Sequence, residues 1–268
     1  MLLEEGHEVF GIRRNQDQLE AGTQPVTGDL TDPQTLPAPP PDLDLAVCAV
    51  AADEGSEAAY RRAYLDAQSG FLRWLGKSGQ GPRRYVMLSS TGVYGQTAGE
   101  LVDEDSATEP TSFRGEVMLA AEELAAASGM ASVAVRLGGI YGPGRQYLID
   151  RARMGLLKKR GYPHYTNRIH RDDAAGLVRH LLFVDNPESL YLGVDNEPAE
   201  EGEVFDWLAQ RLPCTVADAD PGDCAPTATS GRGVGSKRCS NQRLRDSGYA
   251  MRYPSYREGL GSLLDHME

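Results

Sequence analysis

Residues 43–50 read LDLAVCAV, and this stretch decides the fold class. Nearly every position is apolar, which is typical of a strand buried on both faces. The same pattern returns in RYVMLS at residues 84–89 and in SVAVRL at residues 132–137. Strands of this kind belong to parallel sheets that helices cover on each side. We therefore expect an α/β fold.

The segments between these strands have the periodicity of helices. Residues 57–76 carry an apolar stripe, and residues 115–127 are rich in alanine and glutamate. A further strand is expected at residues 8–12, entered from the end of a helix that Gly6 caps. Helices of this length between strands indicate right-handed crossovers. The sequence predicts a Rossmann-like, doubly wound parallel sheet. The stripe residues are Tyr60, Tyr64, Phe71, Leu72 and Leu75.

Beyond Tyr141 the pattern changes to that of a smaller second part. We expect the Rossmann-like domain over residues 1–145, with residues 165–195 returning to it. Residues 146–268 are expected mostly to form a substrate-binding lid beside the carboxyl ends of the strands, where open α/β sheets bind ligands. The elements expected here are helices at 147–159, 171–183, 201–212 and 256–266, a strand at 189–194 and a loose stretch at 217–238.

The composition excludes several classes of protein. The 268 residues have a mass of 29.1 kDa, with 40% hydrophobic residues, 25% charged residues and a mean hydropathy of −0.43. No apolar run approaches the roughly 20 residues that span a bilayer, and we expect no secretory leader. The 27 basic and 39 acidic residues give a net charge of −12, which disfavours a nucleic-acid partner.

The cysteine and histidine pattern predicts neither a metal site nor a disulfide framework. No CxxC or HExxH spacing occurs in the chain. We expect reduced thiols and a cytoplasmic location. The cysteines are Cys48, Cys214, Cys224 and Cys239.

Five motifs follow one another in a meaningful order. They are GDL at 28–30, SSTGVYG at 89–95, RLGGIYGPG at 136–144, NRIHRDDAAGL at 167–177 and the stretch beginning SN at 240–244. Together they resemble the extended short-chain dehydrogenase/reductases, the epimerase/dehydratase group that binds a nicotinamide dinucleotide. The resemblance covers nearly the whole chain. It implies a Rossmann fold and NAD(P) as the cofactor.

The resemblance implies catalytic roles for two residues of SSTGVYG. Ser90 is expected to hold the substrate oxygen, because a hydroxyl at the end of a strand can donate to a developing oxyanion. Capping of the following turn is its alternative role. Tyr94 is the candidate for proton transfer, provided that a nearby cation lowers the pKa of its hydroxyl. Arg114 is the candidate for that cation. A packing role is the competing interpretation.

The family also carries a tyrosine and a lysine four residues apart on the next helix. Aligning that helix by its LAAEE ending at 119–123 puts Arg114 at the tyrosine position and Met118 at the lysine position. A guanidinium does not release a proton near neutral pH, and a thioether neither donates nor carries charge. Phe113, the nearest aromatic residue, has no hydroxyl. The sequence resembles the atypical family members that lack this pair.

The resemblance also implies a set of binding residues. Arg13 and Arg14 follow the strand at 8–12, where an acidic residue would bond the ribose of NAD, and two guanidinium groups suit the 2′-phosphate of NADP. We therefore expect NADP as the cofactor, with NAD as the alternative. The competing interpretation is that Arg13 and Arg14 are an ordinary pair of arginines on a surface loop, with no role in binding. Asp172 or Asp173 is expected to cap a helix. The remaining implied contacts are Asp29, Leu30, Ala51 (within the small residues 49–52), Ser89, Gly139 and Ile140 to the cofactor, and Thr91, Arg114, Tyr141 and His170 to the substrate.

Residues 1–6 read as the last turns of the helix that follows the first strand and glycine-rich loop of such a fold. Roughly 20 residues are thus expected to be absent. A start codon assigned too late is the favoured explanation, with a fragment or a locally re-paired sheet as alternatives. The absent strand would be central, which predicts a slot nearly 10 Å (about two strand spacings) wide between residues 8–12 and 43–50. The glycine-spaced stretch 231–235 follows no strand and opens no helix.

Three functions are compatible with these observations. The first is an atypical NAD(P)-binding oxidoreductase or isomerase acting on a small carbonyl, hydroxyl or nucleotide-sugar substrate, which the retained Ser90 and YGPG loop favour. The second is a catalytically silent NADP-binding or protein-interaction module, which the lost tyrosine and lysine favour. The third is a non-redox lyase or cyclase. Residues 57–76 and 113–127 could build the two-helix face through which relatives often form homodimers.

Overall fold

A four-stranded parallel sheet forms the centre of the molecule. The computed structural model describes residues 1–79, 81–220, 222 and 235–266. The sheet has the strand order β11-β6-β4-β3, and all of its pairs are parallel. The α/β fold class is thereby confirmed. The strands are β3 (Leu45–Cys48), β4 (Arg84–Ser90), β6 (Ser132–Leu137) and β11 (Leu190–Gly193).

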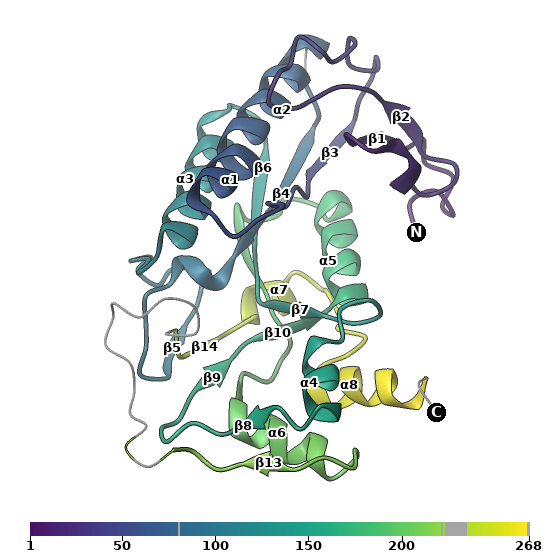
Figure 1. The fold of residues 1–268 in the computed structure, drawn as a ribbon. Helices are drawn as coiled ribbons and strands as arrows, with labels where there is room; N and C mark the ends of the chain where they lie inside the picture. Colours follow the sequence, from purple (N-terminus) through teal and green to yellow (C-terminus); the bar gives the residue numbers. More distant parts are fainter. Residues whose placement is uncertain (80, 221, 223–234, 267–268) are drawn as a thin grey trace.

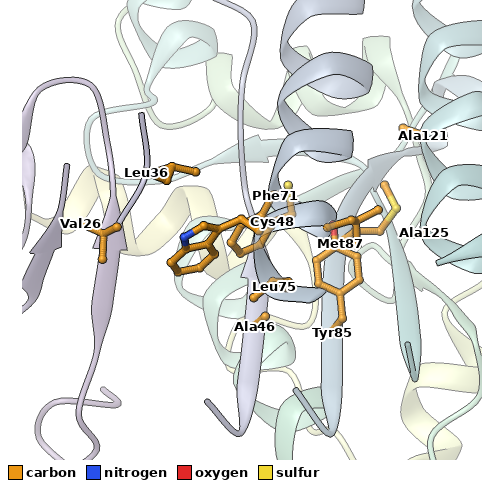
Figure 2. Packing of buried hydrophobic residues seen from close by; sticks show 12 residues of the cluster. Val26, Leu36, Ala46, Cys48, Phe71, Leu75, Tyr85, Met87, Ala121 and Ala125 are labelled. Carbon is orange, nitrogen blue, oxygen red and sulfur yellow. The ribbon is translucent and has the colours of Figure 1, made fainter. Parts of the chain in front are cut away.

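Helices cover both faces of this sheet (Figure 1). Residues of β4 alternate between the two layers: Tyr85 and Met87 pack in the cluster under α2 and α3, and Val86 packs in the cluster under α5. Figure 2 shows Tyr85 and Met87 beside Phe71 of α2. A strand with apolar residues on both faces requires this double cover. The helices are α1 (Glu57–Arg61), α2 (Ala67–Leu75) and α3 (Phe113–Ala127) on one side and α5 (Arg171–Phe183) on the other.

A separate two-stranded ribbon lies beside β3. Strand β1 (Phe10–Ile12) pairs in parallel with β2 (Gln24–Val26), and within the described part of the chain neither pairs with β3. A cavity of about 1080 Å³ separates the ribbon from β3 and is lined by both. This is the place where the sequence predicts a slot. Side chains connect the two sides, since Val26 and Leu36 belong to the same apolar cluster as Phe71 (Figure 2).

The second lobe has its own apolar core and several short strand pairs. Tyr141, Ile149, Phe205, Trp207 and Tyr256 are among its buried residues. Its helices are α4 (Tyr147–Arg153), α6 (Glu201–Ala209) and α8 (Tyr256–Asp265), whereas α7 (Gln242–Asp246) packs against β11 of the central sheet. The pairs are β7 (Gly139–Tyr141) with β10 (Arg168–His170), β8 (Leu157–Lys158) with β13 (Val216–Ala217), β9 (Tyr165–Thr166) with β12 (Ala199–Glu200), and β5 (Glu100–Val102) with β14 (Lys237–Cys239).

Some predicted element boundaries are wrong. The helix expected at 147–159 ends after Arg153, because Gly155 adopts a φ of 67° and the chain continues into β8. The helix expected at 57–76 contains a π-helical turn, Arg62–Asp66, between α1 and α2. The stretch at 217–238 ends in β14. Most of the glycine-spaced stretch 231–235 lies outside the described residues.

Candidate functional site

The cavity between β1 and β3 gathers five of the residues predicted to contact the cofactor. Arg13 follows β1, Asp29 follows β2, and Ala51 follows β3. All three line the cavity, together with Arg14 and Leu30. Because parallel strands end at the same edge of a fold, residues far apart in the sequence meet here.

The guanidinium groups of Arg13 and Arg14 lie at this cavity and make only weak, exposed interactions with the protein. Arg13 donates from Nη1 to the carbonyl of Gln18 at 2.8 Å. Arg14 donates from Nη2 to Oδ2 of Asp53 at 3.0 Å, and Arg62 lies 3.6 Å from the other carboxylate oxygen. These side chains are exposed, and exposed ion pairs contribute little free energy. Both arginines are therefore free to exchange these contacts for a ligand phosphate.

The loop carrying Asp29 and Leu30 is fixed from two directions. Oδ1 of Asp29 accepts from the amide of Thr31 at 2.9 Å and from its hydroxyl at 2.8 Å, and these bonds hold the pKa of Asp29 below its usual value. The Leu30 carbonyl lies against Gly70 of α2, where a Cβ would stand 1.7 Å from the oxygen. Helix α2 thus sets the position of this loop.

These features fit the adenosine end of a dinucleotide. The cavity is large, its rim carries the two arginines, and the small Ala49 and Ala51 leave the backbone accessible. Its described lining also contains Gly11 and Gly28, and neither of these opens a helix. The described lining therefore provides groups for a ribose, its phosphate and an adenine ring, but no glycine-rich turn for a pyrophosphate.

The other three predicted cofactor contacts lie outside this cavity. The Ser89 hydroxyl donates to Glu122 of α3 and is buried. Ile140 packs in the core under α5, and Gly139 is exposed at the start of β7. Gly139 nevertheless stands at the carboxyl end of β6, two residues past Leu137.

Ser90 ends β4 and is half-buried. Its Oγ accepts from the amide of Gly92 at 3.0 Å and so caps the 3-10 turn Thr91–Val93. The capping role is thus present. The hydroxyl still has its own proton to donate, because accepting a bond uses only a lone pair. Thr91 is buried within the turn.

Tyr94 is held at both sides of its hydroxyl. The group donates to the carbonyl of Asp103 at 2.7 Å and accepts from Nη1 of Arg136 at 2.7 Å. Burial raises the pKa of Tyr94 to about 12 despite the neighbouring guanidinium. Proton transfer near neutral pH requires a lowered pKa, whereas the pKa of Tyr94 is raised. The structure favours the packing role.

Arg114 is not the cation beside that hydroxyl. Its Nη2 donates to the carbonyl of Gly55 at 2.9 Å, and its guanidinium lies over the rings of Phe113 and Tyr60, 4.7 and 5.4 Å from their centroids. Met118, at the lysine position of the motif, is buried in the cluster that contains Tyr94. Neither residue supplies an acid or a base.

Sequence reasoning missed a buried polar network behind SSTGVYG. Arg136 of β6 forms a bidentate pair with Glu122, at 2.7 Å for Nη2 to Oε2 and 3.0 Å for Nε to Oε1. Ser89 and Tyr94 attach to opposite ends of this pair. The sequence did contain a signal for this network, because each of two elements expected to be buried carries a charged residue. These residues are Arg136 in the strand SVAVRL and Glu122 in the alanine-rich helix.

Tyr141 and His170 lie together at the start of α5. Their ring centroids are 5.4 Å apart, and the ring of Tyr253 lies 4.0 Å from that of His170. Nδ1 of His170 accepts from the Asp172 amide at 3.2 Å and caps α5. The expectation that Asp172 or Asp173 is the cap is therefore wrong. Burial lowers the pKa of His170, which keeps the ring neutral for this accepting role.

Asp173 instead anchors the C-terminal region to α5. It is completely buried, and its carboxylate accepts from the backbone amides of Arg252 and Tyr253, each at 2.8 Å, and from the Tyr249 hydroxyl at 3.0 Å. Three donors on one carboxylate satisfy its charge without a cation.

Comparison with known proteins identifies the class. A family model described as NAD(P)H-binding matches residues 1–184, and the chain belongs to this family. A solved structure of a protein assigned to the NAD-dependent epimerases/dehydratases, from Methylobacillus flagellatus, is 34% identical over 99% of this chain and 92% of that one, with a TM-score of 0.76. The resemblance to the epimerase/dehydratase group is thereby confirmed.

Two further relatives are more distant. A functionally unknown conserved protein from Silicibacter pomeroyi DSS is 27% identical over 99% of this chain and 92% of that one, with a TM-score of 0.74. A 3-diazoavenalumate denitrifying reductase from a Streptomyces species is 26% identical over 286 residues, covering 96% of this chain and 92% of that protein. The chain is thus an NAD(P)-binding, epimerase/dehydratase-like member of an oxidoreductase family, with a reductase among its relatives.

The described residues add three observations on other predicted features. None of their helices has the length and apolarity needed to cross a bilayer. No group of three or more His, Cys, Asp or Glu side chains among them could hold a metal ion. Cys48, Cys214 and Cys239 carry free thiols, and Cys224 lies outside the described residues.

Proposed function

We propose that the protein is an NADP-dependent oxidoreductase that acts on a small carbonyl or hydroxyl substrate. The placement of Arg13 and Arg14 in the same cavity as Asp29, Leu30 and Ala51 carries this proposal. When bound, the cofactor would supply a hydride to the carbonyl carbon, and the carbonyl oxygen would take up a proton from solvent. The protein's own residues bind and orient both partners.

The choice of NADP over NAD follows from charge. Two exposed guanidinium groups stand at the end of β1, and arginine forks match the geometry of a phosphate. Their only partners among the described residues are an exposed carboxylate and a backbone carbonyl. A 2′-phosphate is a stronger partner than either of these.

Ser90 is the residue that we propose holds the substrate oxygen. It is half-buried at the carboxyl end of β4, and its Oγ is fixed by the Gly92 amide. Its proton is then available to a carbonyl oxygen on which negative charge develops. Tyr94 contributes by supporting this turn, since both of its hydroxyl bonds are already used.

A catalytically silent NADP-binding module is the second candidate. Arg114 and Met118 replace the acid and the cation of the family, and their contacts are those of packing residues. A non-redox lyase or cyclase would also be consistent with these two residues. Turnover is the property that separates the candidates.

Binding of NADPH and NADH to the full chain tests the cofactor assignment. Titration followed by nicotinamide fluorescence should show NADPH binding about tenfold or more tightly than NADH. Replacing both arginines (Arg13→Ser with Arg14→Ser) should remove that difference and leave NADH binding unchanged. Arg61→Ser is the matched control, because Arg61 pairs with Glu57 on the surface of α1 and does not line the cavity. Equal affinities in the unmodified protein would refute the NADP assignment.

A panel of small aldehydes and ketones with NADPH tests the reaction. Ser90→Ala should lower kcat about 10²–10³-fold if its hydroxyl stabilises the developing oxyanion. Tyr94→Phe should retain turnover, because its hydroxyl supports the turn and does not transfer the proton. NADPH binding without turnover on any substrate would favour the silent module.

We further propose a cytoplasmic location, which the three free thiols support. A homodimer through α1–α2 and α3 is also proposed. These helices lie side by side on the outer face of the sheet in Figure 1. Analytical ultracentrifugation of the full chain tests the dimer, and a monomer at micromolar concentration would exclude it.

A further inference from the structure

Arg168 carries a charge that nothing in the described structure pairs. It lies on β10, closely surrounded by the second lobe yet still partly exposed. Its guanidinium makes no hydrogen bond or ion pair with any described residue, although arginine has five N–H donors. The side chains of Asp195 and Glu201 lie near it without forming an ion pair with it, and Glu201 is already paired with Arg160 at 2.9 Å.

Three buried polar atoms of residues near Arg168 also have no hydrogen-bond partner among residues 1–79, 81–220, 222 and 235–266. They are Oδ2 of Asp195 and the hydroxyls of Tyr141 and Tyr256. Asp195 is 2% exposed, and its other oxygen accepts from the Glu197 amide at 3.2 Å. A buried polar atom without a partner costs about 1–3 kcal/mol. These three atoms, together with the guanidinium of Arg168, indicate a place for a polar ligand group.

Arg168 lies on the two-stranded sheet of β7 and β10, which follows the carboxyl end of the four-stranded sheet that carries Ser90. Arg168 pairs in register with Gly139 of β7, which follows β6. Ser90 pairs in register with Leu137, the last residue of β6. A substrate whose oxygen meets Ser90 therefore has Arg168 on the neighbouring strand pair.

We propose that Arg168, Asp195, Tyr141 and Tyr256 bind a carboxylate group of the substrate. This inference rests on the proposed function and names the substrate class, a carbonyl or hydroxyl compound that also bears a carboxylate.

The hydrogen-bond donors of this cluster match a carboxylate ligand. The guanidinium and the two phenols are donors, and burial raises the pKa of Asp195 to about 8, so that its carboxyl carries a proton near neutral pH and donates as well. A carboxylate offers about four lone-pair positions to these groups. Its single charge matches the single cation, whereas a diphosphate would add uncompensated charge beside Glu201 and Glu258.

The test compares carboxylates with their neutral amides on the full chain. The probes are acetate, benzoate and 4-hydroxybenzoate against acetamide, benzamide and 4-hydroxybenzamide, with binding read by ligand-observed NMR. At least one carboxylate should bind the unmodified protein more tightly than its amide. Arg168→Gln should weaken that binding about tenfold or more, because it removes a charge-assisted pair, and Arg168→Lys should fall between them.

Arg153→Gln is the matched control. It removes the same charge from the exposed end of α4 and should leave carboxylate binding unchanged. Equal binding by the unmodified protein and Arg168→Gln would overturn the proposal, as would preference for no carboxylate or displacement by millimolar inorganic phosphate. Because the guanidinium of Arg168 pairs with no residue in the described part of the chain, Arg168→Gln should fold as stably as the unmodified protein. NADPH titration of the same samples reports on the proposed function separately.

Discussion

Glu122 and Arg136 form an ion pair buried between α3 and β6, and their side chains are only 11% and 6% exposed. Removing one partner of such a pair leaves the other charge buried and costs about 3–5 kcal/mol. Glu122→Ala should therefore lower the free energy of unfolding by about 3 kcal/mol or more in urea denaturation. It should also loosen the turn at Ser90, because Ser89 and Tyr94 are bonded to the same pair.

Glu123→Ala provides the control for this prediction. Glu123 is the next residue on α3 and is exposed, so its loss should change the free energy of unfolding by less than about 0.5 kcal/mol. Similar unfolding midpoints for the two variants would show that the buried pair contributes no stability.

Residues at strand ends were predictable, and residues that depend on side-chain pairing were not. Arg13, Asp29 and Ala51 meet because parallel strands end together, which the order of the elements already implies. The contact of Arg136 with Tyr94 depends on strand register and on which face each side chain occupies. No spacing in the sequence encodes that contact.

At the scale of elements, the close contact between α2 and the loop after β2 is the most sensitive to substitution. A Cβ at Gly70 would stand 1.7 Å from the Leu30 carbonyl, so Gly70→Ala must push that loop away from α2. We expect a loss of about 1–3 kcal/mol in unfolding free energy. Weaker NADPH binding should accompany it, because Asp29 and Leu30 line the cavity.

Gly76→Ala, at the end of the same helix, is the matched control. Gly76 has a φ of −62°, and a Cβ there would meet nothing within 4 Å. The substitution should be neutral or stabilising by up to about 1 kcal/mol, since alanine restricts the unfolded chain. Chemical denaturation and NADPH titration of both variants check the pair, and equal behaviour would contradict the packing argument.

Long elements were predictable from the sequence, and short ones were not. The helix at 171–183 and the strand at 132–137 have the predicted ends, because each has a clear periodicity and a turn signal beside it. Strands of two or three residues, such as β5 and β14, are too short to show any period. Strand β2 contains Pro25, which argues against a strand unless it lies at an edge, and β2 is the edge of its ribbon.

For the whole molecule, Asp195 predicts a dependence of stability on pH. Its pKa is raised to about 8 by burial, with Arg168 opposing the shift and Glu197 and Glu258 adding to it. The pKa of an aspartate in an unfolded chain is about 3.9. Between these values the folded state holds a proton that the unfolded state has released, so the free energy of unfolding falls as the pH rises.

Asp195→Asn isolates this effect. The unfolding free energy of the variant should decline less from about pH 5 to about pH 8, with a difference of up to about 4 kcal/mol across this window. Urea denaturation at several pH values checks it, and subtracting the two curves cancels the histidines that both proteins share. Parallel curves would show that Asp195 is ionised in the folded state.

The anchor at Asp173 has a consequence for how the chain is made. Its carboxylate belongs to α5, yet its backbone donors are Arg252 and Tyr253, near the far end of the sequence. A chain emerging from the ribosome builds its N-terminal parts first. Helix α5 therefore lacks these two backbone donors for Asp173 until residues 252 and 253 have been synthesised. A nascent chain stalled before those donors would be a natural client for chaperones and a target for proteolysis.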